Sequence, residues 1–189
     1  MLALAARYVR VVDAINHRIG RVIMYGIFAM MAILLWSTIS KFSDAPSLWT
    51  LEGAQFAMIA YFFLGGPYAI QMGSHVRMDL FYENWSPMRK AMIDAVSVLC
   101  LIVYLGVLLW GAAGSTAYSL GYFGSEPFSF FAGLAIGSED IGTLERSRTI
   151  FRPYLWPIKT VMCVGIILML MQATAELCRD ILRISGEDI

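Results

Sequence analysis

The stretch AVSVLCLIVYLGVLLWGAAGSTAYSLGYF, residues 95–123, contains no charged side chain. A helix that crosses a bilayer needs about 20 mostly apolar residues, so this stretch is longer than one bilayer thickness requires. We expect the helix to tilt, or to project beyond the membrane. Because open strands cannot leave backbone groups unpaired in lipid, the stretch predicts a transmembrane helix.

Three further runs have the same character. Residues 22–39 carry no charge, and residues 53–72 and 154–175 contain only isolated polar side chains. Each run is about the length that a membrane-spanning helix needs. The sequence therefore predicts an all-α membrane protein, a single membrane domain over residues 1–189, with four transmembrane helices at about 22–40, 53–72, 91–122 and 154–177.

The composition agrees with a membrane protein. Hydrophobic residues make up 59% of the chain and charged residues 15%, whereas soluble domains have about 45–50% and 25%. The formal net charge is zero, which gives no bulk attraction for nucleic acid. The three cysteines form no CxxC pair and no metal-ligand spacing. We therefore expect no catalytic residue, no metal and no cofactor on this chain.

The first 21 residues predict a separate amphipathic helix. Apolar side chains recur at helical spacing, at Leu4, Tyr8, Val11, Ile15, Ile19 and Val22. Basic side chains gather on roughly the opposite face, at Arg7, Arg10, His17 and Arg21, with Arg18 at its edge. Such a helix suits a cytoplasmic membrane surface, where each arginine near anionic lipid contributes about 1 kcal/mol. The expected lipid contacts are Arg7, Arg10, Arg18 and Arg21, and packing against a protein partner stays open as the alternative.

The distribution of basic residues predicts the topology. Most of the 14 lysine and arginine residues lie in the N-terminal tail, in the connection 73–90 and in the C-terminal tail. The positive-inside rule therefore places both termini and this connection in the cytoplasm. Because the spans alternate in direction, the connection 123–153 lies on the opposite side of the membrane.

The cytoplasmic connection is a polar segment between two apolar runs. We expect Gly73 to end the second span, and Ser86 and Pro87 to start the third as N-cap and first helical residue. His75 and Asp79 could form a base and its orienting acid, but the segment contains no nucleophile. A proton relay would also need ionisable groups within the spans, which offer almost none. The segment is therefore interpreted as a positioning element.

Other residues predict the ends and contacts of the spans. Trp49 and Glu52 open the second span, where Trp is a normal interfacial anchor and Glu suits the helix dipole. Gly65, Gly66 and Pro67 are expected to kink or loosen that span. Small residues let helices approach closely. Packing faces are therefore expected on the third helix at Gly106, Ala113 and Ala117, and on the fourth at Gly165, Met169, Gln172 and Glu176.

Three motifs resemble those of a known family. WTLE at 49–52, GSHVRMDLFY at 73–82 and RPYLWPIK at 152–159 look like the small, Q-type (DctQ-like) membrane subunit of tripartite ATP-independent periplasmic (TRAP) transporters. The resemblance covers nearly the whole chain. The candidate partner-interface or structural residues are Trp49, Glu52, His75, Arg77, Asp79, Trp156, Lys159, Gln172 and Glu176.

The resemblance implies a function that composition alone does not. In this family a large membrane subunit carries the sodium and substrate sites, and a periplasmic protein captures the substrate, typically an organic acid. This chain would be the small scaffold subunit in the bacterial inner membrane, with both termini cytoplasmic, surrounded by lipid and carrying no sodium itself. The connection 123–153 would face the periplasm, either as a docking surface for the binding protein or as a solvated loop without a partner.

Two other classes are weaker interpretations. The membrane-anchor subunit of a respiratory haem or quinone enzyme would need His within the spans to bind haem, but His17 and His75 lie outside them. A stand-alone transporter would need a membrane-centred Asp or Glu and an internal inverted repeat. The predicted spans provide neither.

Overall fold

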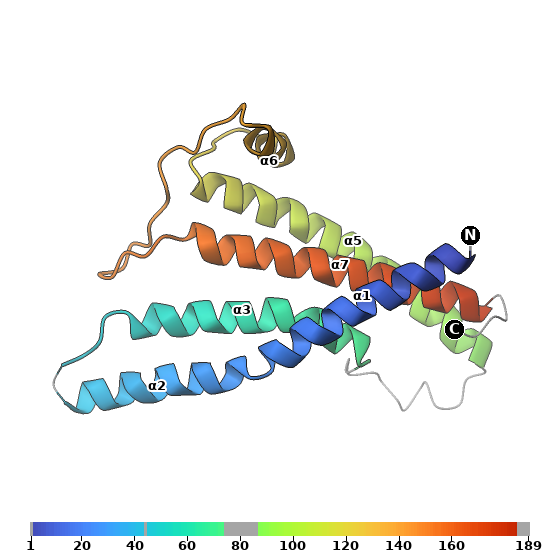
Figure 1. The fold of residues 1–189 in the computed structure, drawn as a ribbon, viewed down its shortest axis with the longest axis horizontal. Coiled ribbons are helices and arrows are strands. Elements are labelled where there is room, and N and C mark those ends of the chain that lie inside the picture. The colour runs from blue at the N-terminus through green and yellow to red at the C-terminus, as the bar shows by residue number, and fades with distance from the viewer. Residues whose placement is uncertain (1, 44, 74–86, 185–189) are drawn as a thin grey trace.

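The computed structural model describes residues 2–43, 45–73 and 87–184, which are mostly helical (Figure 1). No strand forms within these ranges, where a single isolated bridge pairs Arg146 with Tyr154. The prediction of an all-α fold is confirmed. The helices are α1 (Leu2–Ile23), α2 (Gly26–Phe42), α3 (Thr50–Gln71), α5 (Pro87–Ser119), α6 (Pro127–Ile136) and α7 (Trp156–Ile184).

Four long helices lie side by side in the order α2, α3, α7, α5 (Figure 1). Helix α3 contacts both α2 and α7, and α7 contacts both α3 and α5, so α2 and α5 form the two edges of the layer. Helix α1 crosses the layer obliquely and contacts α3 and α7. No residue of α2 is buried. The arrangement is therefore an open layer, whose outer surfaces are left for lipid or for another protein.

Three segments of the described residues are long and apolar enough to cross a membrane: Ala5–Phe42, Ile93–Ser119 and Trp156–Leu182. The first contains both α1 and α2, which a turn at Met24 and Tyr25 separates. Helix α3 is not among the three, because Gln55, Pro67 and its glycines lower its mean hydropathy. The structure thus shows three membrane-capable segments. That α3 forms a fourth span is a proposal.

Local chemistry sets the helix ends. Gly73 has a φ of 60°, and its N–H donates to the Ile70 carbonyl at 3.0 Å, so α3 ends as predicted. Helix α5 starts at Pro87, also as predicted. Helix α3 stays helical through the buried Pro67, since packed neighbouring helices let a helix tolerate such a proline. Helix α7 continues to Ile184, beyond its predicted end.

Glycines bring α3 and α7 into close contact. A Cβ added to Gly165 of α7 would lie 2.6 Å from the carbonyl oxygen of Phe63 in α3. A Cβ added to Gly66 of α3 would lie 2.7 Å from the sulfur of Met169 in α7. Gln172, on the same face of α7, is fully buried. The predicted packing face of the fourth helix is therefore confirmed.

The packing face of α5 is turned slightly from the predicted one. Ala113 and Ala117 are buried as expected, but Gly106 is exposed, and a Cβ there would meet nothing within 4 Å. Its neighbour Leu105 is buried instead and packs in the same cluster as Ile166 of α7. Each helical residue turns about 100° from the last, so an error of one position in the sequence pattern points a side chain to the outside.

Candidate partner interface and polar clusters

Two polar clusters lie near the two ends of α7, which Figure 1 shows at opposite ends of the helical layer. One joins α1 to the C-terminal half of α7. The other joins the connection between α6 and α7 to α3 and to the start of α7. Within the described ranges, no group of three or more His, Cys, Asp or Glu residues is placed to hold a metal ion. The geometry of the clusters instead indicates how the helices are held and which surfaces stay uncovered.

The first cluster, the α1–α7 network, consists of Asp13, Asn16, Gln172, Glu176 and Arg179. Asn16 Nδ2 donates to Gln172 Oε1 at 2.7 Å. Gln172 Nε2 donates to Asp13 Oδ1 at 2.9 Å and to Glu176 Oε1 at 3.2 Å. Arg179 donates to both carboxylate oxygens of Glu176 at 2.6 Å and to Asp13 Oδ2 at 2.7 Å. Every carboxylate of the network therefore has a charged donor, which satisfies these groups at a helix contact.

The α1–α7 network sets the rotation of α1 about its own axis. Asp13 and Asn16 face α7 on the same side of α1 as Val9 and Val12, which are buried against Ala175. Asp13 is the one acidic residue in the sequence of α1, and it is turned inward. The outer side of α1 consequently carries positive charge, at Arg7, Arg10, Arg18 and Arg21, all of which are exposed.

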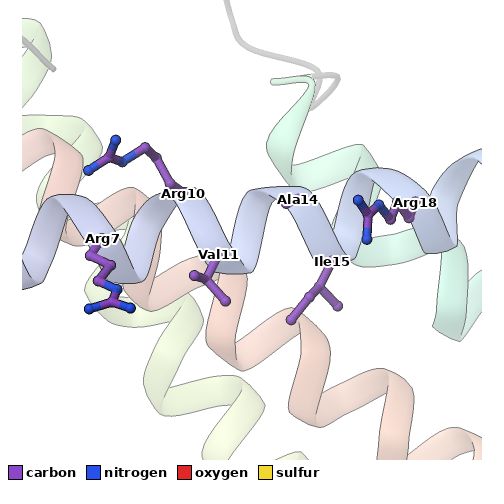
Figure 2. Close-up of a pocket in the computed structure, with 6 residues that line it drawn as sticks. All are labelled: Arg7, Arg10, Val11, Ala14, Ile15 and Arg18. Carbon is purple, nitrogen blue, oxygen red and sulfur yellow. The ribbon is translucent and has the colours of Figure 1, made fainter.

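The arginines of α1 lie beside its exposed apolar residues, not opposite them. Arg7, Arg10 and Arg18 line a shallow groove together with Val11, Ala14 and Ile15 (Figure 2). The predicted arrangement, with basic and apolar residues on opposite faces, was wrong. The face opposite the arginines is instead the one that packs on α3 and α7.

The second cluster, the loop clamp, consists of Glu52, Glu145, Ser147 and Lys159. Ser147 Oγ donates to Glu52 Oε1 at 2.9 Å, and the Glu52 side chain is buried. Lys159 Nζ donates to Glu145 Oε2 at 2.6 Å and to the Ser115 carbonyl at 3.2 Å. The clamp thus ties one connection to α3, α5 and α7 at the same time.

The connection 123–153 contains a short helix and folds back onto α5. It contains α6, which buries Phe130 in a cluster with Leu120 at the end of α5. The N–H of Gly142 donates to the Leu120 carbonyl at 2.9 Å, which folds the connection back onto α5. This approach requires Gly121, which has a φ of 89° and no room for a Cβ. The connection therefore forms a folded surface at the end of the layer where α5 ends.

The structure places six of the nine predicted interface residues. The two clusters contain four of them: Glu52, Lys159, Gln172 and Glu176. Trp49 and Trp156 are exposed at the starts of α3 and α7. The remaining three lie outside the described residues: His75, Arg77 and Asp79.

The sequence analysis missed three of the five residues of the α1–α7 network and two of the four residues of the loop clamp. Asp13 and Asn16 share a helix face with Val9 and Val12, but the sequence pattern favoured the neighbouring face, which contains Val11 and Ile15. Arg179 follows Glu176 by three residues, a separation at which helical side chains meet. Glu145 and Ser147 carried no comparable signal, because their partners come from other helices.

An all-helical chain whose described residues include three membrane-capable segments is a membrane protein. The chain also matches, over residues 30–183, the family described as tripartite ATP-independent periplasmic transporters, DctQ component. It belongs to this family and is a DctQ-like small subunit of a TRAP transporter, as the sequence motifs predicted. Helix α1 lies outside the matched residues. No curated protein matches the chain.

Proposed function

We propose that this chain is the scaffold subunit of a sodium-coupled importer of organic acids or related small solutes. Its partners would be a large membrane subunit, which binds sodium and substrate, and a periplasmic substrate-binding protein. The observation that carries this function is the family match over residues 30–183. The arrangement of charge supports it, since among the described residues the two polar clusters lie at the ends of the layer, and its middle contains none of the ionisable groups of a transport pathway.

The proposed membrane arrangement has four spans, α2, α3, α5 and α7, with α1 at the cytoplasmic surface of the bacterial inner membrane. Helix α3 lies between α2 and α7, and these neighbours cover part of its surface. A helix covered in this way can cross a membrane with a lower hydropathy than one surrounded by lipid. The excess of Lys and Arg in the two tails supports cytoplasmic termini.

A stripe on α3 is the candidate contact for the large subunit. Leu51, Gln55, Met58 and Phe62 are all exposed and recur at helical spacing. An exposed glutamine amide is costly in hydrocarbon, because lipid offers it no hydrogen-bond partner. A neighbouring protein helix could supply that partner to Gln55.

Co-purification tests the assembly. The tagged chain, expressed together with the large hydrophobic subunit, should retain that subunit through affinity and size-exclusion steps in mild detergent. Gln55→Leu should reduce the retained amount, whereas Gly106→Ala, an exposed change on α5, should not. Failure of the unaltered chain to retain the large subunit would contradict the proposed function.

Thiol labelling tests the orientation. In a variant without Cys100, Cys163 and Cys178, a single Ser138→Cys should react with a membrane-impermeant reagent added to cells with a permeable outer membrane. A single Arg21→Cys should be protected. The reverse pattern would invert the proposed topology. The respiratory-anchor alternative receives no support from the family match.

A further inference from the structure

The arginines of α1 differ from Arg179 and Lys159 in their ion pairing. Arg179 and Lys159 each make a salt bridge. Arg7 and Arg18 make no ion pair with the residues that the structure describes, and Arg10 donates only from Nε to the Ala6 carbonyl, at 3.2 Å. The three guanidinium groups of Arg7, Arg10 and Arg18 therefore lie on the exposed surface of α1, and none of them pairs with a carboxylate of the described residues.

The groove between these arginines has both charged and apolar walls. In Figure 2, Arg7, Val11 and Ile15 point to one side of α1, Arg10 points to the other, and Arg18 lies one turn beyond Ala14. Ala14 lines the middle of the groove, where its small side chain leaves space between the larger ones. Val11 and Ile15 remain about half exposed, at 51% and 40%.

The groove lies on α1 near the C-terminal end of α7. The inner side of α1 is bound through Asp13 to Arg179, near the charged C-terminal end of α7. Charged residues of a membrane protein gather at the level of the lipid headgroups, and arginine near the end of a span extends toward them. The groove would therefore lie at headgroup depth in the membrane arrangement proposed above.

We infer that this groove binds the headgroup of an anionic phospholipid. Arg7 and Arg10 on the two sides of the groove and Arg18 at its end donate to the headgroup, while Val11 and Ile15 contact the first carbons of the acyl chains. Guanidinium groups present planar pairs of donors that match phosphate oxygens. Exposed apolar side chains beside them favour a ligand with a hydrocarbon part over a soluble anion. The inference rests on the proposed position in the membrane, and it assigns a ligand to a helix that the family match does not cover.

Native mass spectrometry of the full-length chain in detergent tests the inference. The probes are dioleoylphosphatidylglycerol and dioleoylphosphatidylcholine, which share acyl chains and differ in headgroup charge. The unaltered chain should bind the anionic lipid more tightly. The variant Arg7→Gln/Arg10→Gln/Arg18→Gln should lose up to about 100-fold of that affinity at low salt, the sum expected for three basic residues near a lipid surface.

Matched variants separate the groove from general charge effects. Arg148→Gln/Arg152→Gln removes two exposed arginines at the other end of the layer and should leave lipid affinity unchanged. Arg7→Lys/Arg10→Lys/Arg18→Lys keeps the charge and should retain more affinity than the glutamine variant. Equal affinity in the glutamine variant and the unaltered chain, or an equal loss in the loop control, would overturn the inference.

Two further measurements distinguish a bound lipid from a bound soluble anion. Val11→Ser/Ile15→Ser changes only exposed side chains and should weaken binding of the anionic lipid severalfold. A large excess of inorganic phosphate should leave the lipid bound. Unchanged lipid affinity in the serine variant, or full displacement by phosphate, would show a site for a soluble anion instead.

The lipid experiment is independent of the transport partners. If the glutamine variant loses the lipid but still retains the large subunit, both the inference and the proposed function stand. If the unaltered chain shows no headgroup preference but still assembles, only the lipid site is overturned. If it prefers anionic lipid but never assembles, the proposed function is overturned and the lipid site stands.

Discussion

Asp13 in α1 accepts a hydrogen bond from Arg179 in α7 at 2.7 Å, across 166 positions of sequence. The contact joins the first helix of the chain to the last. Both side chains are only about a quarter exposed, and Glu176 shares the same guanidinium group. This contact turns the one acid of α1 inward and leaves its arginines outside.

Loss of this contact should free α1. In Arg179→Gln the carboxylates of Asp13 and Glu176 lose a charged donor, and a hydrogen bond to a charged group contributes about 1.5–3 kcal/mol. Backbone amides of residues 5–20 should exchange with deuterium faster than in the unaltered chain, as measured by mass spectrometry in detergent. The control Arg21→Gln removes an exposed arginine of α1 and should not change the exchange. Equal protection in both variants would show that apolar packing alone holds α1.

The buried amide pair Asn16–Gln172 should show strong coupling. Gln172→Leu leaves Asn16 Nδ2 without its acceptor, and an unsatisfied buried group costs about 1–3 kcal/mol. Asn16→Leu should cost less, since Oδ1 of Asn16 already lacks a partner among the described atoms. The double variant should regain part of the loss, because two apolar groups replace two polar ones. Thermal unfolding of all four proteins measures this cycle, and additive losses would contradict the predicted coupling.

Gly165 should be far less tolerant of a methyl group than Gly106. Gly165→Ala would place a carbon against the Phe63 carbonyl and force α3 and α7 apart, at a cost of about 1–3 kcal/mol. Gly106→Ala meets nothing within 4 Å and should leave the melting temperature unchanged or raise it slightly, through helix propensity. Similar melting temperatures in the two variants would contradict the close contact.

The loop clamp should protect its connection from proteolysis. Glu52→Ala removes the acceptor of Ser147 Oγ, so cleavage by trypsin after the exposed Arg148 should become severalfold faster. Gln55→Ala, one turn further along α3, provides the control because Gln55 is exposed. The cleavage rate is read from the appearance of the two fragments on gels. No difference between the variants would mean that Glu145 and Lys159 hold the connection without Glu52.

Local patterns predicted the helices and some of their ends. Long uncharged runs have no other stable form in lipid, and Gly73 and Pro87 mark the end of one helix and the start of the next through their own backbone chemistry. Helix α6 could have been found in the same way, since Pro127 starts it and Gly137, with a φ of 78°, ends it. Its short length made it easy to miss within a polar connection.

Contacts between distant segments could not be predicted. The sequence pattern predicts an apolar face of α1 that includes Val11 and Ile15, but the face that packs inward is formed by Val9 and Val12. Both sets recur at helical spacing, so the sequence pattern alone does not choose between them. The choice depends on Arg179, which lies at the far end of the chain and binds Asp13.

Reconstituted transport tests the central claim most directly. The large subunit and the substrate-binding protein, with organic acid as substrate, are placed in proteoliposomes under an inward sodium gradient, with and without this chain. Uptake should require this chain, and Glu52→Ala should lower the rate without changing which organic acid is preferred. Equal uptake without this chain, or a changed substrate preference in Glu52→Ala, would contradict a scaffold role.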